Sequence, residues 1–117
     1  MTPFGKKLRQ LRSAHNMTQA ALAEKLDVSA AYLSALEHGK KGAPPRRIVL
    51  AVIELFQLIW DDAEEIEKLA RESRSRVVID TENLSPDATL LANRFSEKLP
   101  QVDEKTIRLW LRTLTNM

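Results

Sequence analysis

The chain has 117 residues and a formal net charge of +2, and apolar and charged residues make up 44% and 29% of it. This balance is typical of a globular protein that can bury a core, and it excludes a mainly disordered chain. No cysteine is present, so disulfides, iron–sulfur clusters and thiolate zinc sites are excluded, and we expect a reducing, cytoplasmic location.

Positive charge is concentrated in the first half of the chain. Residues 1–60 carry nine Lys and Arg against four acidic residues, a net charge of +5, whereas residues 61–117 have a net charge of −3. A basic head beside an acidic remainder suits binding to a polyanion, although chance clustering of solvated charges gives the same pattern. Glycine and aromatic residues are scarce, which favours an all-α fold.

A hydroxyl residue precedes each of the first three expected helices. These residues are Thr2, Thr18 and Ser29. Thr and Ser are strong N-cap residues, because the side-chain oxygen accepts a hydrogen bond from a backbone N–H of the first turn. The expected helices cover residues 3–15, 19–26 and 29–38. Two short helices joined by a sharp turn at Asp27 therefore follow a longer first helix, and Gly39 ends the third.

A basic loop and two further helices follow. Pro44-Pro45 starts a fourth helix to about Phe56, whose apolar surface is wider than one core face requires, so we expect it to contact a second subunit. Asp61-Asp62 begins a fifth helix, because the helix dipole favours negative charge in the first turn. This helix should end by Arg74.

The last third of the chain contains one β-branched run and two capped helices. Residues 76–80 suit one short strand, which would pair with its copy across a two-fold axis or lie as an extended connector. Ser85 and Asp103 cap the two helices. Their apolar stripes are too narrow for an independent domain, so we expect them to pack on the head or on a partner subunit.

Residues 18–39, TQAALAEKLDVSAAYLSALEHG, resemble the helix-turn-helix of Cro/CI-type, or Xre-like, repressors. The resemblance rests on the joined pattern of T-Q, L-A, the V-S turn, L-S-x-L-E and a glycine followed by lysines, and it covers roughly residues 4–70. The family usually has glycine at the turn, where this chain has Asp27. Aspartate tolerates the left-handed backbone better than most residues.

The resemblance implies a five-helix DNA-binding head over residues 1–74. Residues 75–117 would then form a C-terminal extension, with a short strand and two helices, for dimerisation or packing. Residues 29–38 would lie in the major groove as the recognition helix. The expected base-facing residues are Ser29, Ala30, Ala31, Tyr32, Ser34 and Ala35. This set contains no Gln, Asn or Arg, the side chains that make bidentate contacts with bases. We therefore expect contacts with the DNA backbone and the shape of the DNA to supply much of the specificity.

The expected phosphate contacts surround this helix. They are Thr18, Gln19, His38, Lys40, Lys41, Arg46 and Arg47. Gln19 matches the phosphate-contacting glutamine of the family, at a helix start whose backbone N–H groups attract anions. The basic residues would clamp the DNA backbone on either side of the groove, and the alternative for each of these residues is an ordinary solvated side chain.

Two further sets of residues have expected structural roles. Arg12 and Glu37 match the positions where this family often places an ion pair between the first and third helices, the alternative being two independent surface charges. The candidates for a dimer interface are Val49, Ile53, Phe56, Trp60, Val77, Val78, Ile79 and Trp110.

The resemblance implies a sequence-specific regulator of transcription that binds double-stranded DNA. We expect a repressor that acts as a homodimer on a palindromic operator, in the bacterial nucleoid or encoded by a phage. The alternative is an antitoxin-like or adaptor protein that binds a protein partner through its C-terminal third, and RNA binding is a third option, for which the chain has no exposed aromatic pair or RNA-type motif. We expect no enzyme activity, cofactor, metal site or membrane segment.

Overall fold

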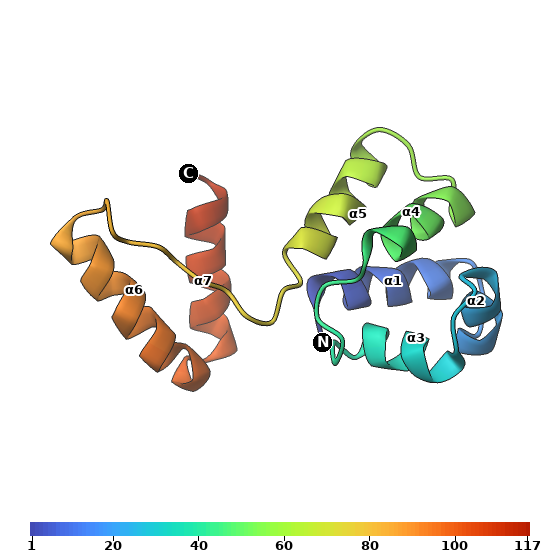
Figure 1. The fold of residues 1–117 in the computed structure, drawn as a ribbon, viewed down its shortest axis with the longest axis horizontal. Coiled ribbons are helices and arrows are strands. Elements are labelled where there is room, and N and C mark those ends of the chain that lie inside the picture. Colours follow the sequence, from blue (N-terminus) through green and yellow to red (C-terminus); the bar gives the residue numbers. More distant parts are fainter. The chain divides into compact units, whose positions relative to one another are not determined.

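Seven α-helices and one short 3-10 helix make up the structure, a computed structural model that describes residues 1–117 (Figure 1). The helices are α1 (Pro3–Ala14), α2 (Gln19–Lys25), α3 (Ala30–Glu37), α4 (Arg46–Leu55), α5 (Asp61–Arg71), α6 (Pro86–Lys98), η1 (Leu99–Gln101) and α7 (Glu104–Thr115). The expected all-α fold is therefore confirmed. None of these helices is both long and apolar enough to cross a membrane.

The helix starts follow the capping residues in the sequence. Thr2, Thr18, Ser29 and Ser85 have an extended backbone, and each side-chain oxygen accepts a hydrogen bond at 3.0–3.1 Å from the N–H three residues on. Asp103 stands at the N-cap of α7, but its side chain makes no capping hydrogen bond. The other four residues satisfy an N–H group that the first helical turn leaves without a partner.

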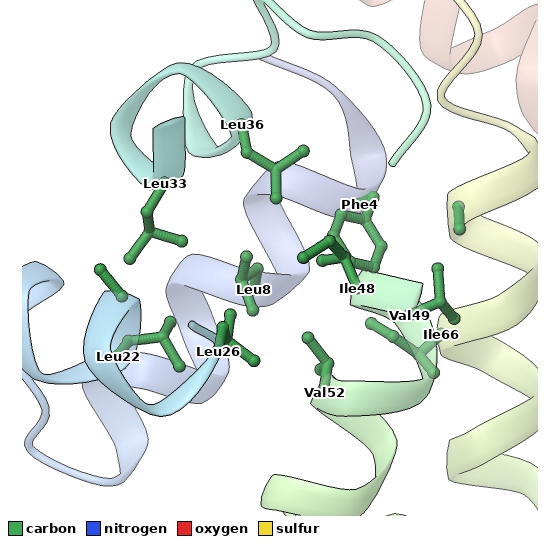
Figure 2. Close-up of a cluster of buried hydrophobic side chains, with 12 residues drawn as sticks. Phe4, Leu8, Leu22, Leu26, Leu33, Leu36, Ile48, Val49, Val52 and Ile66 are labelled. Carbon is green, nitrogen blue, oxygen red and sulfur yellow. The ribbon is translucent and has the colours of Figure 1, made fainter. Parts of the chain in front are cut away.

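The chain forms two compact units, Met1–Val77 and Val78–Met117. Helices α1 to α5 build the first unit around one apolar core (Figure 2). The largest members of this core are Phe4, Leu8, Leu22, Leu26, Leu33, Leu36, Ile48, Val49, Val52 and Ile66. Each fully buried side chain of this size contributes roughly 1.5–3 kcal/mol. The core therefore holds α2 and α3 through their inward faces and leaves their outer faces in solvent.

Helix α4 has apolar residues on the side that faces the central core and on the side that faces α5. Ile48 and Val52 lie in the central core, while Val49 lies on the side of α4 that faces α5 (Figure 2). Val49 is only 5% exposed. The burial of Val49 arises within one chain, because α5 packs on this side of α4, and its place in a dimer interface stays a prediction.

The second unit contains α6, η1 and α7, and it has no buried residue. The rings of Phe95 and Trp110 lie with their centroids 5.5 Å apart and join the two long helices. Leu91, Leu111 and Leu114 remain 61–67% exposed. This helical hairpin, residues 86–115, thus leaves much of its apolar surface in contact with water.

The expected short strand does not form. Residues 76–80 contain no strand or bridge, and the side chains of Val77, Val78 and Ile79 are exposed. A strand needs a second strand for its backbone hydrogen bonds, and the rest of this chain is helical. β-branched composition alone could not supply that partner.

Candidate nucleic-acid interface

The turn between α2 and α3 is short and has one left-handed residue. Asp27 has a φ of 56°, and its neighbour Val28 donates its backbone N–H to the Ala23 carbonyl at 3.0 Å. The left-handed residue ends α2, and Ser29 then caps α3. Leu22 and Leu33 lie in the core on the inner side of the turn, so two short helices are held at a sharp angle (Figures 1 and 2).

Helix α3 divides into an inner and an outer face. Leu33, Leu36 and Glu37 are buried. None of the six expected base-facing residues is buried: Ser29, Ala30 and Ala31 are exposed, Ser34 and Ala35 are half-buried, and the half-buried Tyr32 packs against the edge of the core. The outer face therefore carries small side chains and one phenol ring, and small side chains allow another molecule to approach the helix closely.

A buried carboxylate joins the first three helices. Glu37 is 1% exposed, and its two oxygens accept hydrogen bonds from Arg12 Nε at 2.9 Å and Arg12 Nη2 at 3.2 Å. A third donor is Gln19 Nε2, 3.0 Å from Glu37 Oε1. Arg12 Nη1 also donates to the Met17 carbonyl at 3.0 Å. A bidentate pair of this kind is directional, so it holds α3 at a defined angle to α1 and α2.

Gln19 therefore has a structural partner that the sequence did not indicate. Its amide nitrogen carries two hydrogens, and the contact with Glu37 uses one of them. The other hydrogen remains available to an acceptor outside the fold. In the same way, Thr18 accepts a hydrogen bond from the Ala21 N–H at 3.0 Å, which leaves its own hydroxyl hydrogen free to be donated.

Basic side chains lie beyond the end of α3. Lys40, Lys41, Arg46 and Arg47 are exposed, and none of them forms an ion pair with an acidic residue. Lys41 Nζ stands 5.7 Å from the centroid of the Tyr32 ring, near enough for a cation–π contact. These four cations come from the loop after α3 and from the first turn of α4, and they are free to bind an anion.

A family model described as a helix-turn-helix domain matches residues 3–72 of this chain. The chain belongs to the helix-turn-helix family. It is also 46% identical over 62 residues to a Bacillus subtilis (strain 168) protein named as an uncharacterized HTH-type transcriptional regulator, RghRB. That match covers 53% of this chain and 45% of the relative, so it spans less than half of the relative's length. No solved structure matches the chain.

The resemblance read from residues 18–39 is thus confirmed, and those residues form the helix-turn-helix itself. The two helices of the motif are α2 and α3. His38 follows α3 directly, is exposed, and has its ring Nδ1 2.7 Å from the Ser34 carbonyl oxygen.

The expected dimer residues are scattered over the structure. Phe56 packs within its own chain, with its ring centroid 4.8 Å from that of His15, and Ile53 is half-buried against the core. Trp60 is 83% exposed. The remaining candidates are Trp110, in contact with Phe95, and the exposed residues Val77, Val78 and Ile79.

Gly5 and Ser73 have structural roles in the first unit that the sequence did not indicate. A Cβ atom on Gly5 would lie 2.6 Å from the Leu36 carbonyl oxygen, so only glycine lets α1 approach the end of α3 this closely. A single glycine inside a helical pattern is a signal that could have indicated such an approach.

Ser73 is the second such residue. It is 2% exposed, and its hydroxyl accepts a hydrogen bond from the Phe4 N–H at 2.9 Å while donating to the Leu69 carbonyl at 2.6 Å. It thereby satisfies an N–H group in the first turn of α1. No local pattern could have indicated a contact across 69 positions of the sequence.

Proposed function

We propose that this chain is a sequence-specific double-stranded DNA-binding regulator of transcription that reads the major groove with α3. One observation carries the proposal: α3 offers an outer face of small side chains, is anchored by a buried ion pair, and is followed by four unpaired cations. The regulatory role draws support from the relative named as an HTH-type transcriptional regulator. The proposed activity is binding, with no catalytic step.

Base edges and phosphates would be contacted by different residues. Ser29, Ser34 and Tyr32 can each make single hydrogen bonds to base edges, and the alanine methyl groups can contact thymine methyl groups. Lys40, Lys41, Arg46 and Arg47 would neutralise phosphates. Because no side chain of α3 can contact a base in a bidentate way, DNA shape would supply much of the preference for one sequence.

The test begins with selection of bound fragments from random duplexes, followed by fluorescence anisotropy between about 50 and 200 mM salt. Lys41→Ala or Arg46→Ala should weaken binding to every sequence and lower the salt slope by about one for each lost phosphate contact. Lys68→Ala, on the exposed surface of α5, is the control. A protein that binds no duplex even at low salt would refute the proposal.

Ser34→Ala tests the base contacts separately. It should relax the preference at one base pair by on the order of 1 kcal/mol and leave the salt slope unchanged. Equal losses on selected and random DNA would show that Ser34 makes no specific base contact.

We further propose that the protein is a repressor that acts as a homodimer on a palindromic operator. The helical hairpin of residues 86–115 supports a second copy as its partner, because two such hairpins can bury their apolar faces in a four-helix bundle. Leu111 and Leu114 extend the stripe that Ile107 and Trp110 begin on α7, and both are more than half exposed. Two heads on one duplex would then contact half-sites about 34 Å apart.

Leu111→Glu tests this assembly, since a charge in the apolar face should convert the dimer to a monomer. The measurement is sedimentation equilibrium, with Gln101→Glu as a control that adds the same charge on the exposed 3-10 helix. A wild-type chain that remains monomeric at micromolar concentration would refute the homodimer. The adaptor that binds a different protein through its C-terminal third would then be the better account of the same apolar face.

A further inference from the structure

A cleft of about 370 Å³ lies in the first unit, between the start of α4 and the end of α5. Its lining comes from the loop before α4, the first turns of α4, and the end of α5, two helices that lie side by side (Figure 1). Val49 and Ala70 are buried and form an apolar floor. The volume lies within the usual range for sites that hold small molecules.

Three arginines line this cleft. Arg46 comes from the first turn of α4, Arg71 is the last residue of α5, and Arg74 follows three positions later. All three are exposed, and none lies within 4.0 Å of a carboxylate oxygen. The only acidic residue in the lining is Glu67, which also lacks an ion-pair partner. The cleft thus has a positive charge excess over an apolar floor.

The tertiary fold brings these arginines together. A Cβ atom on Gly42 would lie 3.5 Å from Ser75 Oγ, so the loop before α4 packs against the chain that follows α5. Residues 46 and 74 thereby share one cleft. Guanidinium groups present planar N–H donors that match the oxygens of a phosphate, and they keep their charge at all physiological pH values.

We propose that Arg46, Arg71 and Arg74 form an oxyanion site that binds a phosphate group. The phosphate has two sources of the same chemistry. One is the DNA backbone beside the recognition helix, a case that rests on the proposed function and extends the DNA contact to the end of α5. The other is a free phosphorylated small molecule, whose apolar part would lie on Val49 and Ala70.

The first arm of the test titrates the full chain with inorganic phosphate, against sodium chloride at equal ionic strength, and follows the arginine Nε–H signals by NMR. Arg46, Arg71 and Arg74 should shift together and saturate. The double variant R71Q/R74Q should weaken phosphate binding by about tenfold or more, because two charged hydrogen-bond donors are lost. R9Q/K68Q removes the same charge from exposed positions outside the cleft and should change the affinity by less than about twofold.

Glu67→Gln provides a gain-of-function check within the same arm. Removal of the one carboxylate in the cleft should strengthen phosphate binding several-fold, since like charges repel across a short distance. A merely structural cluster of arginines would show no such gain.

The second arm measures the salt dependence of DNA binding for the same variants. If the DNA backbone is the source, R71Q/R74Q should lower the slope by about two while R9Q/K68Q leaves it unchanged. If the source is a free phosphorylated molecule, the slope stays constant while inorganic phosphate still saturates the site.

The proposal is overturned if R71Q/R74Q behaves like R9Q/K68Q in both arms. Failure of the proposed function is a separate result. If the chain binds no duplex but its phosphate binding still saturates, the oxyanion site is upheld and the proposal of DNA binding is refuted. Thermal unfolding followed by circular dichroism checks that both double variants keep the wild-type fold.

Discussion

Glu37 is a carboxylate that the fold removes almost completely from water, and three side-chain hydrogen bonds from Arg12 and Gln19 compensate it. Arg12 itself is only 16% exposed. Loss of one member of such a pair leaves the other charge poorly solvated. The Arg12–Glu37 pair therefore affects the orientation of α3 as well as the stability of the fold.

We expect Glu37→Gln to lower the free energy of unfolding by about 3 kcal/mol, because Arg12 keeps its charge without a counter-ion. Urea unfolding measures this change. Glu65→Gln is the control: its partner Lys7 lies 3.7 Å away on the surface, so its loss should cost less than about 1 kcal/mol. Equal effects of the two substitutions would contradict a structural role for the Arg12–Glu37 pair.

Ser73→Ala should cost about 1–3 kcal/mol, since the Phe4 N–H loses its acceptor in a buried position. Ser75→Ala removes an exposed hydroxyl two positions away and should have little effect. Chemical denaturation of both variants tests the difference, and a stable Ser73→Ala protein would show that water replaces the serine.

At the scale of elements, Gly5 lowers the helix propensity of α1 but allows α1 to approach the end of α3 closely. Alanine favours a helix over glycine by about 1 kcal/mol, so Gly5→Ala should stabilise an isolated α1. In the folded chain its Cβ would meet the backbone oxygens of Leu36 and Glu37 at 2.6 and 2.7 Å. We expect a net loss of about 2 kcal/mol in thermal unfolding. Gln10→Ala, on the exposed side of α1, should be neutral or stabilising, and a stabilised Gly5→Ala protein would disprove the close contact.

The turn between α2 and α3 depends on one residue with a φ of 56°. Asp27→Gly should keep or slightly raise stability, because glycine adopts this conformation without steric cost. Asp27→Val should lower stability by about 1–2 kcal/mol, since a β-branched side chain clashes in the left-handed region. The urea midpoints of the two variants measure this difference in stability. Similar midpoints would mean that the turn relaxes to accommodate valine.

For the whole molecule, the core lies entirely in the first unit, and the second unit has no buried side chain. We therefore expect a fragment of residues 1–77 to unfold cooperatively with nearly the stability of the full chain. A fragment of residues 78–117 should show a cooperative transition only at concentrations where it self-associates. Circular dichroism at several concentrations measures both, and loss of folding in the first fragment would show that the units depend on each other.

The sequence by itself determined the parts of this protein that depend on neighbouring residues. The caps at Thr2, Thr18 and Ser29 and the pattern over residues 18–39 placed the helices and indicated the family, because capping and helical periodicity act over three or four positions. The Arg12 and Glu37 positions could be named only through the family resemblance.

Only the tertiary structure decided which distant residues meet. The hydrogen bond from Gln19 to Glu37 spans 18 positions and the one from Phe4 to Ser73 spans 69. The covering of Val49 by α5, the cleft of three arginines and the absence of a strand at residues 76–80 are results of the same kind. Their physical reason is common: burial, charge clustering and strand pairing depend on which segments the folded core brings side by side, and a local pattern carries no record of its distant partners.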